Sequence, residues 1–282
     1  MSGRLLHVER RGRGPALMLL HGFTGSSRSL ARVARAFEPD YETLAPDLPG
    51  HGLSVGEAGA VGRDFDDCVD DLAATLESAG HARAHWLGYS MGARLALACA
   101  VRHTARVASL VLAGARAGIE DPAEREARRR ADEALAARIE ANGVEAFVDE
   151  WLAQPLFESQ RHLGPGFLAA ERRARQGNDA RELAASLRGL GPGTQPPLFE
   201  SLPSLQVPVL LVAGALDGRF VALARDLARR LPRAEVCVIA DAGHAVHLEQ
   251  PEAFLRAARD FLRRVERPAP PFKSSSVQEI AS

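Results

Sequence analysis

One pentapeptide carries the clearest chemical signal in the chain, Gly88-Tyr89-Ser90-Met91-Gly92. It follows an apolar run, His85 to Leu87, and opens a helical pattern, Ala93 to Val101. A serine between a strand and a helix sits on a sharp turn with its hydroxyl exposed, and the flanking glycines let the backbone pack tightly. The pattern therefore predicts a nucleophile elbow. Because G-x-S-x-G also occurs by chance in many proteins, the prediction depends on partner residues in compatible places.

Two later residues can complete a catalytic site with Ser90. Asp217 ends the strand-like segment VPVLLVAGALD, and His244 follows EVCVIADAG. In folds with such an elbow, the acid and then the base follow the serine, each at the end of a later strand. The imidazole must take the serine proton, while the carboxylate orients the imidazole and stabilises its cation. Alone, the aspartate could cap a helix and the histidine close a turn, but their order and spacing together favour a Ser-His-Asp triad.

A glycine-bearing turn, His21 to Ser26, follows the apolar run ALMLL. In this type of site, the backbone N–H of Phe23 joins that of Met91 to form an oxyanion hole. The alternative is an ordinary turn between a strand and a helix. A second turn, Asp47 to Gly52, is expected to shape the loop beside the pocket.

Short apolar runs alternate with helical patterns along the chain. The runs have the length and continuity of buried strands: Ala16 to Leu20, Thr43 to Ala45, His85 to Leu87, Val107 to Ala113, Val207 to Ala213 and Glu235 to Ile239, with Leu5 to Glu9 as a leading strand. The helical patterns are Ser29 to Phe37, Phe65 to Ser78, Gly92 to Arg102, Val221 to Leu231 and Pro251 to Val265. This alternation predicts an α/β fold whose mainly parallel sheet is flanked by helices.

Residues 121–198 break the alternation, because they contain Arg- and Ala-rich helical patterns and no buried-strand run. Such a stretch is too long for a loop and predicts a helical cap insertion. We therefore expect a core in two parts, 1–120 and 199–266, with the cap between them. The segment 267–282 is rich in Pro and Ser and is predicted to be a disordered tail.

Composition favours one catalytic domain that carries an insertion, since 282 residues that are 46% hydrophobic can bury a full core. The formal net charge of -1 provides no global field for nucleic acid or an anionic membrane. No signal-peptide pattern and no apolar stretch of roughly 20 residues is present in the sequence. These observations predict a cytoplasmic protein that binds neither nucleic acid nor membrane and is a monomer or weak homo-oligomer.

The cysteines, Cys68, Cys99 and Cys237, are widely spaced and show no CxxC or metal-ligand pattern. We expect reduced core residues. The sequence also has no P-loop, no G-x-G-x-x-G turn and no His/Cys metal cluster, so no cofactor or metal is predicted.

With these motifs in place, the chain resembles the α/β-hydrolase superfamily over nearly its whole length. More narrowly, it resembles the menaquinone-pathway MenH family, 2-succinyl-6-hydroxy-2,4-cyclohexadiene-1-carboxylate synthase. The segments that carry the narrower resemblance are LLHGFTGSS, GYSMGARLALACA, AGIEDPAEREARRRADEALAARI, FVDEWLAQPLF, SLRGLGPGTQPPL and DAGHAVHLEQPEAF. The cap segments discriminate best, because caps vary widely among relatives.

The resemblance implies a lyase that eliminates pyruvate from 2-succinyl-5-enolpyruvyl-6-hydroxy-3-cyclohexene-1-carboxylate, a small-molecule polycarboxylate. A substrate with three carboxylates favours arginines in the site. Arg94 matches the family's Ser-Met-Gly-x-Arg pattern, which implies that it binds a substrate carboxylate; the alternative is an ion pair with a cap carboxylate. Arg128 matches the arginine of the family's Glu-x-x-Ala-Arg stretch, but three other arginines crowd it, and only one or two can face inward.

Three aromatic residues also match the family. Trp151 and Phe157 correspond to residues that wall the pocket, and Tyr89 to a pocket tyrosine beside the serine. Phe157 could equally pack in the core of the cap. One departure is Gly218, which follows the acid where relatives often carry a larger residue, so we expect a looser loop around Asp217.

The implied mechanism differs from hydrolysis. His244, polarised by Asp217, lets Ser90 remove a ring proton, after which electrons move through the ring and expel pyruvate without an acyl-enzyme. The oxyanion donors are expected to stabilise charge on a conjugated substrate carboxylate. Two alternatives remain open: a carboxylesterase or carbon-carbon bond hydrolase, and a non-catalytic ligand-binding member. The complete triad disfavours the second, whereas Arg94 with cap arginines favours the lyase over a generic esterase.

Overall fold

The computed structural model describes residues 3–267 and contains one sheet of seven strands in the order β1-β3-β2-β4-β5-β6-β7. The strands are β1 (Val8–Arg11), β2 (Ala16–Leu20), β3 (Glu42–Pro46), β4 (Ala84–Tyr89), β5 (Val107–Ala113), β6 (Val209–Gly214) and β7 (Ala234–Ile239). Only β1 pairs antiparallel, with β3, and every other neighbouring pair is parallel. The prediction of a mainly parallel sheet is confirmed.

Five helices of the core occupy the predicted stretches with small shifts at their ends: α1 (Ala31–Phe37), α2 (Phe65–Ser78), α3 (Met91–Arg102), α7 (Gly218–Arg230) and α9 (Pro251–Glu266). A further short helix, α8 (Val246–Glu249), was not predicted from the sequence. Short 3-10 turns are η1 (Ser27–Leu30), η2 (Gly56–Ala58), η3 (Thr104–Arg106) and η5 (Leu202–Ser204). The leading strand begins later than predicted, at Val8 rather than Leu5.

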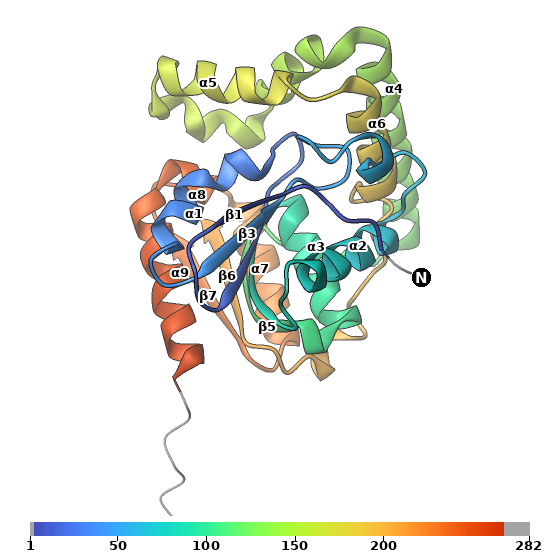
Figure 1. Ribbon diagram of the computed structural model, residues 1–282. Coiled ribbons are helices and arrows are strands. Elements are labelled where there is room, and N and C mark those ends of the chain that lie inside the picture. The colour runs from blue at the N-terminus through green and yellow to red at the C-terminus, as the bar shows by residue number, and fades with distance from the viewer. Residues whose placement is uncertain (1–2, 268–282) are drawn as a thin grey trace, which may run out of the picture.

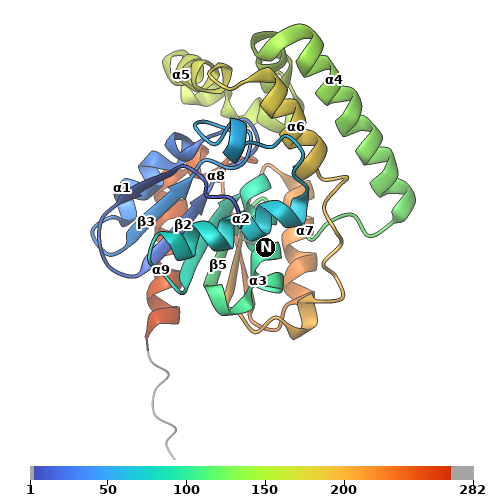
Figure 2. The same ribbon diagram turned by 45° about the vertical axis from the view of Figure 1, so that its right-hand side comes forward.

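Two hydrophobic cores lie on opposite faces of the sheet, because successive side chains of a strand point to opposite sides. In β2, Met18 and Leu20 enter one core, whereas Leu17 and Leu19 enter the other. The first core packs against α2, α3 and α7, and the second against α1 and α9. Figures 1 and 2 show these helices on the two sides of the sheet. Both faces are thus covered, as a parallel sheet requires.

The run that was expected to form the last buried strand is only partly buried. It forms β7, which pairs with β6 alone and lies at the edge of the sheet. An edge strand lacks a neighbour on one side, and Val238 is accordingly 40% exposed. Cys237 on the same strand is partly buried, whereas Cys68 and Cys99 are fully buried in the first core; all three are free.

The helices α4 (Pro122–Leu152), α5 (Pro165–Gln176) and α6 (Ala180–Leu190), with the 3-10 helix η4 (Pro155–Leu163), lie between β5 and β6 and are called the cap helices below. Aspartates cap two of them: Asp121 accepts the Glu124 N–H at 2.7 Å and Asp179 the Glu182 N–H at 2.9 Å. At Gly143 the backbone leaves the helical region (φ 81°, ψ 168°), so α4 consists of two helices joined at a kink.

The cap helices enclose their own apolar cluster and sit above one end of the sheet (Figure 1). The cluster comprises Ala136, Ile139, Phe147, Val148, Leu183, Ala184 and Leu187. The Glu182 carboxylate attaches the cap helices to the core by accepting the N–H groups of Gly56 at 3.0 Å and Ala60 at 2.8 Å. The exact division into core and cap at residues 121 and 198 stays a prediction.

The predicted tail lies, apart from Arg267, outside the described residues. Between residues 3 and 267, no helix has both the length and the apolar character needed to cross a membrane.

Candidate active site

Ser90 occupies the turn between β4 and α3 in a strained backbone conformation, with φ 53° and ψ −108°. Positive φ is uncommon for a residue with a side chain and costs about 1–3 kcal/mol. The turn is fixed by the Ser90 N–H, which donates to the Ala113 carbonyl at 2.8 Å. Only glycine fits at position 92, because a Cβ there would lie 2.2 Å from the Leu20 carbonyl oxygen. These are the features of a nucleophile elbow.

Ser90, His244 and Asp217 form a continuous hydrogen-bond chain. The Ser90 Oγ lies 3.1 Å from the His244 Nε2, and the His244 Nδ1 lies 3.0 Å from the Asp217 Oδ2. The contacts fit a tautomer in which Nδ1 donates to the carboxylate and Nε2 accepts from the hydroxyl. The imidazole has room because residue 114 is glycine at φ +66°: a Cβ there would lie 2.9 Å from the His244 Cε1.

Asp217 also performs the structural role that its position after a strand suggested. Its Oδ1 accepts the Phe220 N–H at 3.2 Å and so caps α7, while Oδ2 contacts His244. Its own N–H donates to the Gly214 carbonyl at 3.0 Å. Gly218 therefore does not leave the carboxylate loose, because both oxygens and the backbone are held.

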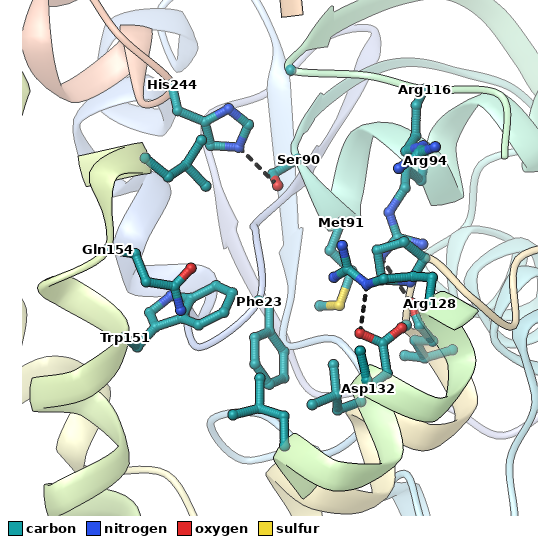
Figure 3. A pocket seen from close by; sticks show the side chains of 18 of the residues that line it. Phe23, Ser90, Met91, Arg94, Arg116, Arg128, Asp132, Trp151, Gln154 and His244 are labelled. Atoms are coloured by element: carbon teal, nitrogen blue, oxygen red, sulfur yellow. Dashed lines mark hydrogen bonds and ion pairs between the residues drawn. The ribbon is translucent and has the colours of Figure 1, made fainter. Parts of the chain in front are cut away.

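A cavity of about 430 Å³ opens above Ser90 and is walled by both the core and the cap helices. Figure 3 shows Ser90, Met91 and Phe23 between two sides: Arg94, Arg116 and Arg128 on one, Trp151 and Gln154 on the other. Further lining residues are Gly114, Ala131, Asp132, Leu135, Leu156, Ser186, Leu187, Leu190, Gly191, Pro192, Arg219, Phe220 and His244.

Phe23 and Met91, the two residues expected to supply an oxyanion hole, both line this cavity. Within residues 3–267 neither backbone N–H has a hydrogen-bond acceptor, so both are available to a ligand. The Phe23 ring packs edge-on against Trp151 at a centroid distance of 5.5 Å. This contact links the turn after β2 to the cap helices.

Two buried histidines hold the turn that contains Phe23. The His51 Nε2 accepts the Thr24 N–H at 3.1 Å, and the His21 Nε2 accepts the Leu48 N–H at 2.9 Å. Burial lowers the pKa of His21 to about 4 and that of His51 to about 3, so both are neutral acceptors at pH 7. The turn from Asp47 to Gly52 thus has the structural position expected of it.

Arg94 is 6% exposed and lines the cavity from helix α3. Its Nη2 donates to the Leu190 carbonyl at 2.7 Å and its Nη1 to the Gln195 Oε1 at 3.3 Å. No carboxylate pairs with Arg94 in the described part of the chain. The structure therefore does not contain the alternative, an ion pair between Arg94 and a cap carboxylate. Burial, helped by the positive charges of Arg128 and Arg116, lowers the pKa of Arg94 to about 9. The group remains charged at neutral pH.

Arg128 is the only arginine of its crowded stretch that reaches the cavity. Its Nε donates to the Asp132 Oδ1 at 2.7 Å, while the Asp132 Oδ2 accepts the Gly193 N–H. The neighbours turn elsewhere: Arg129 and Arg130 pair with Glu126, and Arg125 donates to the Ile119 carbonyl.

Two further arginines, Arg116 and Arg219, also line the cavity. The sequence analysis did not identify them. They follow β5 and the acid Asp217, so their place after a strand end was the available signal. Burial and the charge of Arg219 lower the pKa of Arg116. Four guanidinium groups therefore face one cavity.

The aromatic residues are distributed differently from the expectation. Trp151 lines the cavity, but Phe157 packs behind it at 5.8 Å and does not. Tyr89 also lies off the cavity wall: its ring contacts those of His244 at 5.4 Å and His247 at 4.5 Å. The reason is the alternation of side chains at the end of β4, which directs Tyr89 and Ser90 to different sides.

The combination of these groups defines the chemistry of the cavity. A hydroxyl coupled to an imidazole can take a proton or attack a carbonyl, two free N–H groups can stabilise an oxyanion, and the arginines favour an anionic ligand. Among the described residues, no group of three or more His, Cys, Asp or Glu side chains is arranged to hold a metal ion.

Comparison with known proteins agrees with this picture. The family model for the alpha/beta hydrolase fold matches residues 15–251. The chain is 34% identical to the 2-succinyl-6-hydroxy-2,4-cyclohexadiene-1-carboxylate synthase of Serratia proteamaculans over 88% of this chain and 93% of that protein. MenH from S. aureus superimposes with a TM-score of 0.88 at 30% identity, over 93% of this chain and 99% of that one. A thermophilic esterase from Thermogutta terrifontis gives 0.80 at 28% identity, over 93% and 94%.

Proposed function

The chain belongs to the α/β-hydrolase family and, within it, to the 2-succinyl-6-hydroxy-2,4-cyclohexadiene-1-carboxylate synthases, and on that basis we propose a reaction for the cavity above Ser90. The protein is a carbon-oxygen lyase of menaquinone biosynthesis that eliminates pyruvate from 2-succinyl-5-enolpyruvyl-6-hydroxy-3-cyclohexene-1-carboxylate. Its location in the cytoplasm and its state as a monomer or weak homo-oligomer stay predictions from the sequence.

The names of substrate and product define the chemical task. The substrate has one ring double bond, at C3–C4, and the product has two, at C2–C3 and C4–C5. A proton must therefore leave C2, and its electrons form the C2–C3 double bond. The original double bond moves to C4–C5, and the bond from C5 to the enolpyruvyl oxygen breaks. The site must therefore supply a base, stabilise a carbanion next to the succinyl carbonyl, and bind three carboxylates.

Ser90 with His244 is the base in this proposal. The 3.1 Å contact between the Ser90 Oγ and the His244 Nε2 lets the hydroxyl take the C2 proton as its own proton passes to the imidazole. Asp217 stabilises the resulting imidazolium through the 3.0 Å contact at Nδ1. No acyl-enzyme forms, because the serine oxygen never bonds to carbon.

The backbone N–H groups of Phe23 and Met91 are the proposed oxyanion donors. Charge from C2 moves onto the succinyl carbonyl oxygen, which is attached directly to that carbon, rather than onto a carboxylate. Both amides line the cavity beside Ser90 and have no acceptor within residues 3–267. Donors already fixed in place stabilise the charge as it develops.

One observation carries the proposal: Arg94 presents a buried guanidinium to the cavity with no carboxylate partner in the described part of the chain. Buried charges are normally paired. A substrate carboxylate completes this pair, and a fork of N–H donors suits it. An esterase of neutral substrates has no use for such a group.

The direct test is turnover of the succinyl-enolpyruvyl substrate by the purified enzyme. Loss of the substrate should yield the diene, seen by its absorbance, and pyruvate in equal amounts. Simple esters serve as the comparison, because the Thermogutta terrifontis protein is an esterase on a similar scaffold. Rapid ester hydrolysis without pyruvate release would reject the lyase in favour of a hydrolase.

Arg94→Ala is expected to lower kcat/KM by about 10²-fold, mainly through KM, because it removes a charge-assisted contact worth about 1.5–3 kcal/mol. Steady-state kinetics of pyruvate release measure this effect. Arg102→Ala is the matched control, since Arg102 lies on the same helix but outside the cavity and pairs with Asp70 on the surface. Unchanged kinetic constants in the Arg94 variant would disprove its role.

A further inference from the structure

Arg116 and Arg219 form a pair of cations that the roles proposed above leave unused. Both line the cavity, and neither forms an ion pair with a carboxylate in the described residues. Arg116 is partly buried, and within residues 3–267 its guanidinium makes one hydrogen bond, from Nε to the Gly118 carbonyl at 3.3 Å. Burial, and after it the positive charge of Arg219, lowers the pKa of Arg116. Both positive charges line the same cavity, and an anion bound between them would reduce their mutual repulsion.

These two arginines come from chain segments that also hold His244. Arg116 lies two residues after Gly114, whose backbone abuts the His244 ring. Arg219 lies two residues after Asp217, and next to it the Phe220 ring contacts the His244 ring at a tilt, with centroids 4.5 Å apart. The pair is thus built into the framework of the proton-transferring groups.

The other two arginines of the cavity, Arg94 and Arg128, already bond to groups of the protein. Arg94 is buried and held by hydrogen bonds to Leu190 and Gln195, and Arg128 forms an ion pair with Asp132. They suit carboxylates that stay on the ring throughout the reaction. Arg219, in contrast, is exposed at the cavity rim, where a departing group must pass.

We propose that Arg116 and Arg219 form a second anion subsite that binds the enolpyruvyl group and receives it as it leaves. The inference rests on the proposed function. As the C2 proton moves to Ser90 and His244, the electron pair of the C5–O bond departs with the oxygen and gives the enolate of pyruvate. The enolate carbon then takes a proton, for which the His244 imidazolium is the source, so no proton is gained or lost overall. Carboxylate and enolate oxygens on adjacent carbons match a guanidinium fork.

The test measures binding without turnover, by NMR titration of the whole enzyme with pyruvate and, separately, with succinate. In an Arg116→Gln/Arg219→Gln double variant, the Kd for pyruvate should rise at least about tenfold, as expected for loss of charge-assisted hydrogen bonds. Succinate should be affected much less. In Arg94→Ala, the Kd for succinate should rise more than the Kd for pyruvate.

Arg130→Gln/Arg173→Gln is the matched control, because it removes the same charge from exposed cap positions outside the cavity. If the main double variant does not fold, Arg219→Gln alone, at an exposed position, must still weaken pyruvate binding. Native pyruvate affinity in either folded variant would overturn the subsite. Failure of the native enzyme to release pyruvate from the substrate would instead overturn the proposed function, which the titration does not depend on.

Discussion

Ser90→Ala is expected to lower kcat for pyruvate release by about 10³-fold while leaving substrate binding nearly unchanged, because general base catalysis contributes about 10²–10⁴-fold. In the proposed proton path the serine hydroxyl is the group that takes the C2 proton. His244 also lines the cavity, and its Nε2 lies 3.1 Å from the hydroxyl. Without the hydroxyl, the relay from C2 to the imidazole is lost. Initial rates and substrate binding by the variant measure the two effects.

Ser204→Ala provides the control for this prediction. Ser204 is exposed and lies outside the cavity, where its hydroxyl donates to the Ser201 carbonyl at 2.9 Å, so its removal should change kcat little. Mass spectrometry of native enzyme quenched during turnover separates the two chemistries of Ser90. A base leaves the protein mass unchanged, whereas an accumulating acyl-enzyme would contradict the proton-transfer mechanism.

Acidification from pH 7 to pH 5 is expected to destabilise the fold by roughly 6 kcal/mol, about 2 kcal/mol for each of three buried histidines. Burial lowers the pKa of His21 to about 4 and those of His51 and His247 to about 3. In the unfolded chain these groups titrate near 6.5, so between pH 6.5 and 4 the unfolded state binds more protons. The contribution of these histidines to the free energy of unfolding is therefore fully present above pH 6.5, and it decreases as the pH falls.

Local structure explains why the folded state resists these protons. The Nε2 atoms of His21 and His51 already accept backbone N–H groups, and His247 lies between Tyr89 and Phe254. Urea unfolding at several pH values measures how the free energy of unfolding changes with pH. His247→Gln should remove about one third of this pH dependence. His162→Gln, a change at an exposed position, should remove none of it. A free energy of unfolding that is flat from pH 7 to pH 5 would show that these histidines are charged in the fold.

Local patterns were sufficient to predict most of the fold. The run at β2 is apolar without interruption, and α2 spans Phe65–Ser78 as predicted from the sequence. The misjudged strand is β7, because its exposure depends on its place at the sheet edge, which only the order of all strands determines.

The candidate site was predictable where a residue type and a strand end coincide. Ser90, Asp217 and His244 satisfy that condition, and their contacts agree with it. Arg116 and Arg219 do not stand out among the 35 Lys and Arg residues of the sequence. Both follow strand ends, but that signal alone does not show which arginines line the cavity, because this depends on how loops after different strands converge.

The origin of the four cavity arginines has a consequence for protein engineering. Arg128 alone belongs to the cap helices, whereas Arg94, Arg116 and Arg219 are carried by α3, the loop after β5 and α7. A chimaera that keeps this core and receives the cap of a distant relative would retain three of its four guanidinium groups. Cap transplantation should thus alter which molecular shapes the enzyme accepts more readily than it abolishes the preference for anions, and redesign toward neutral substrates has to begin in the core.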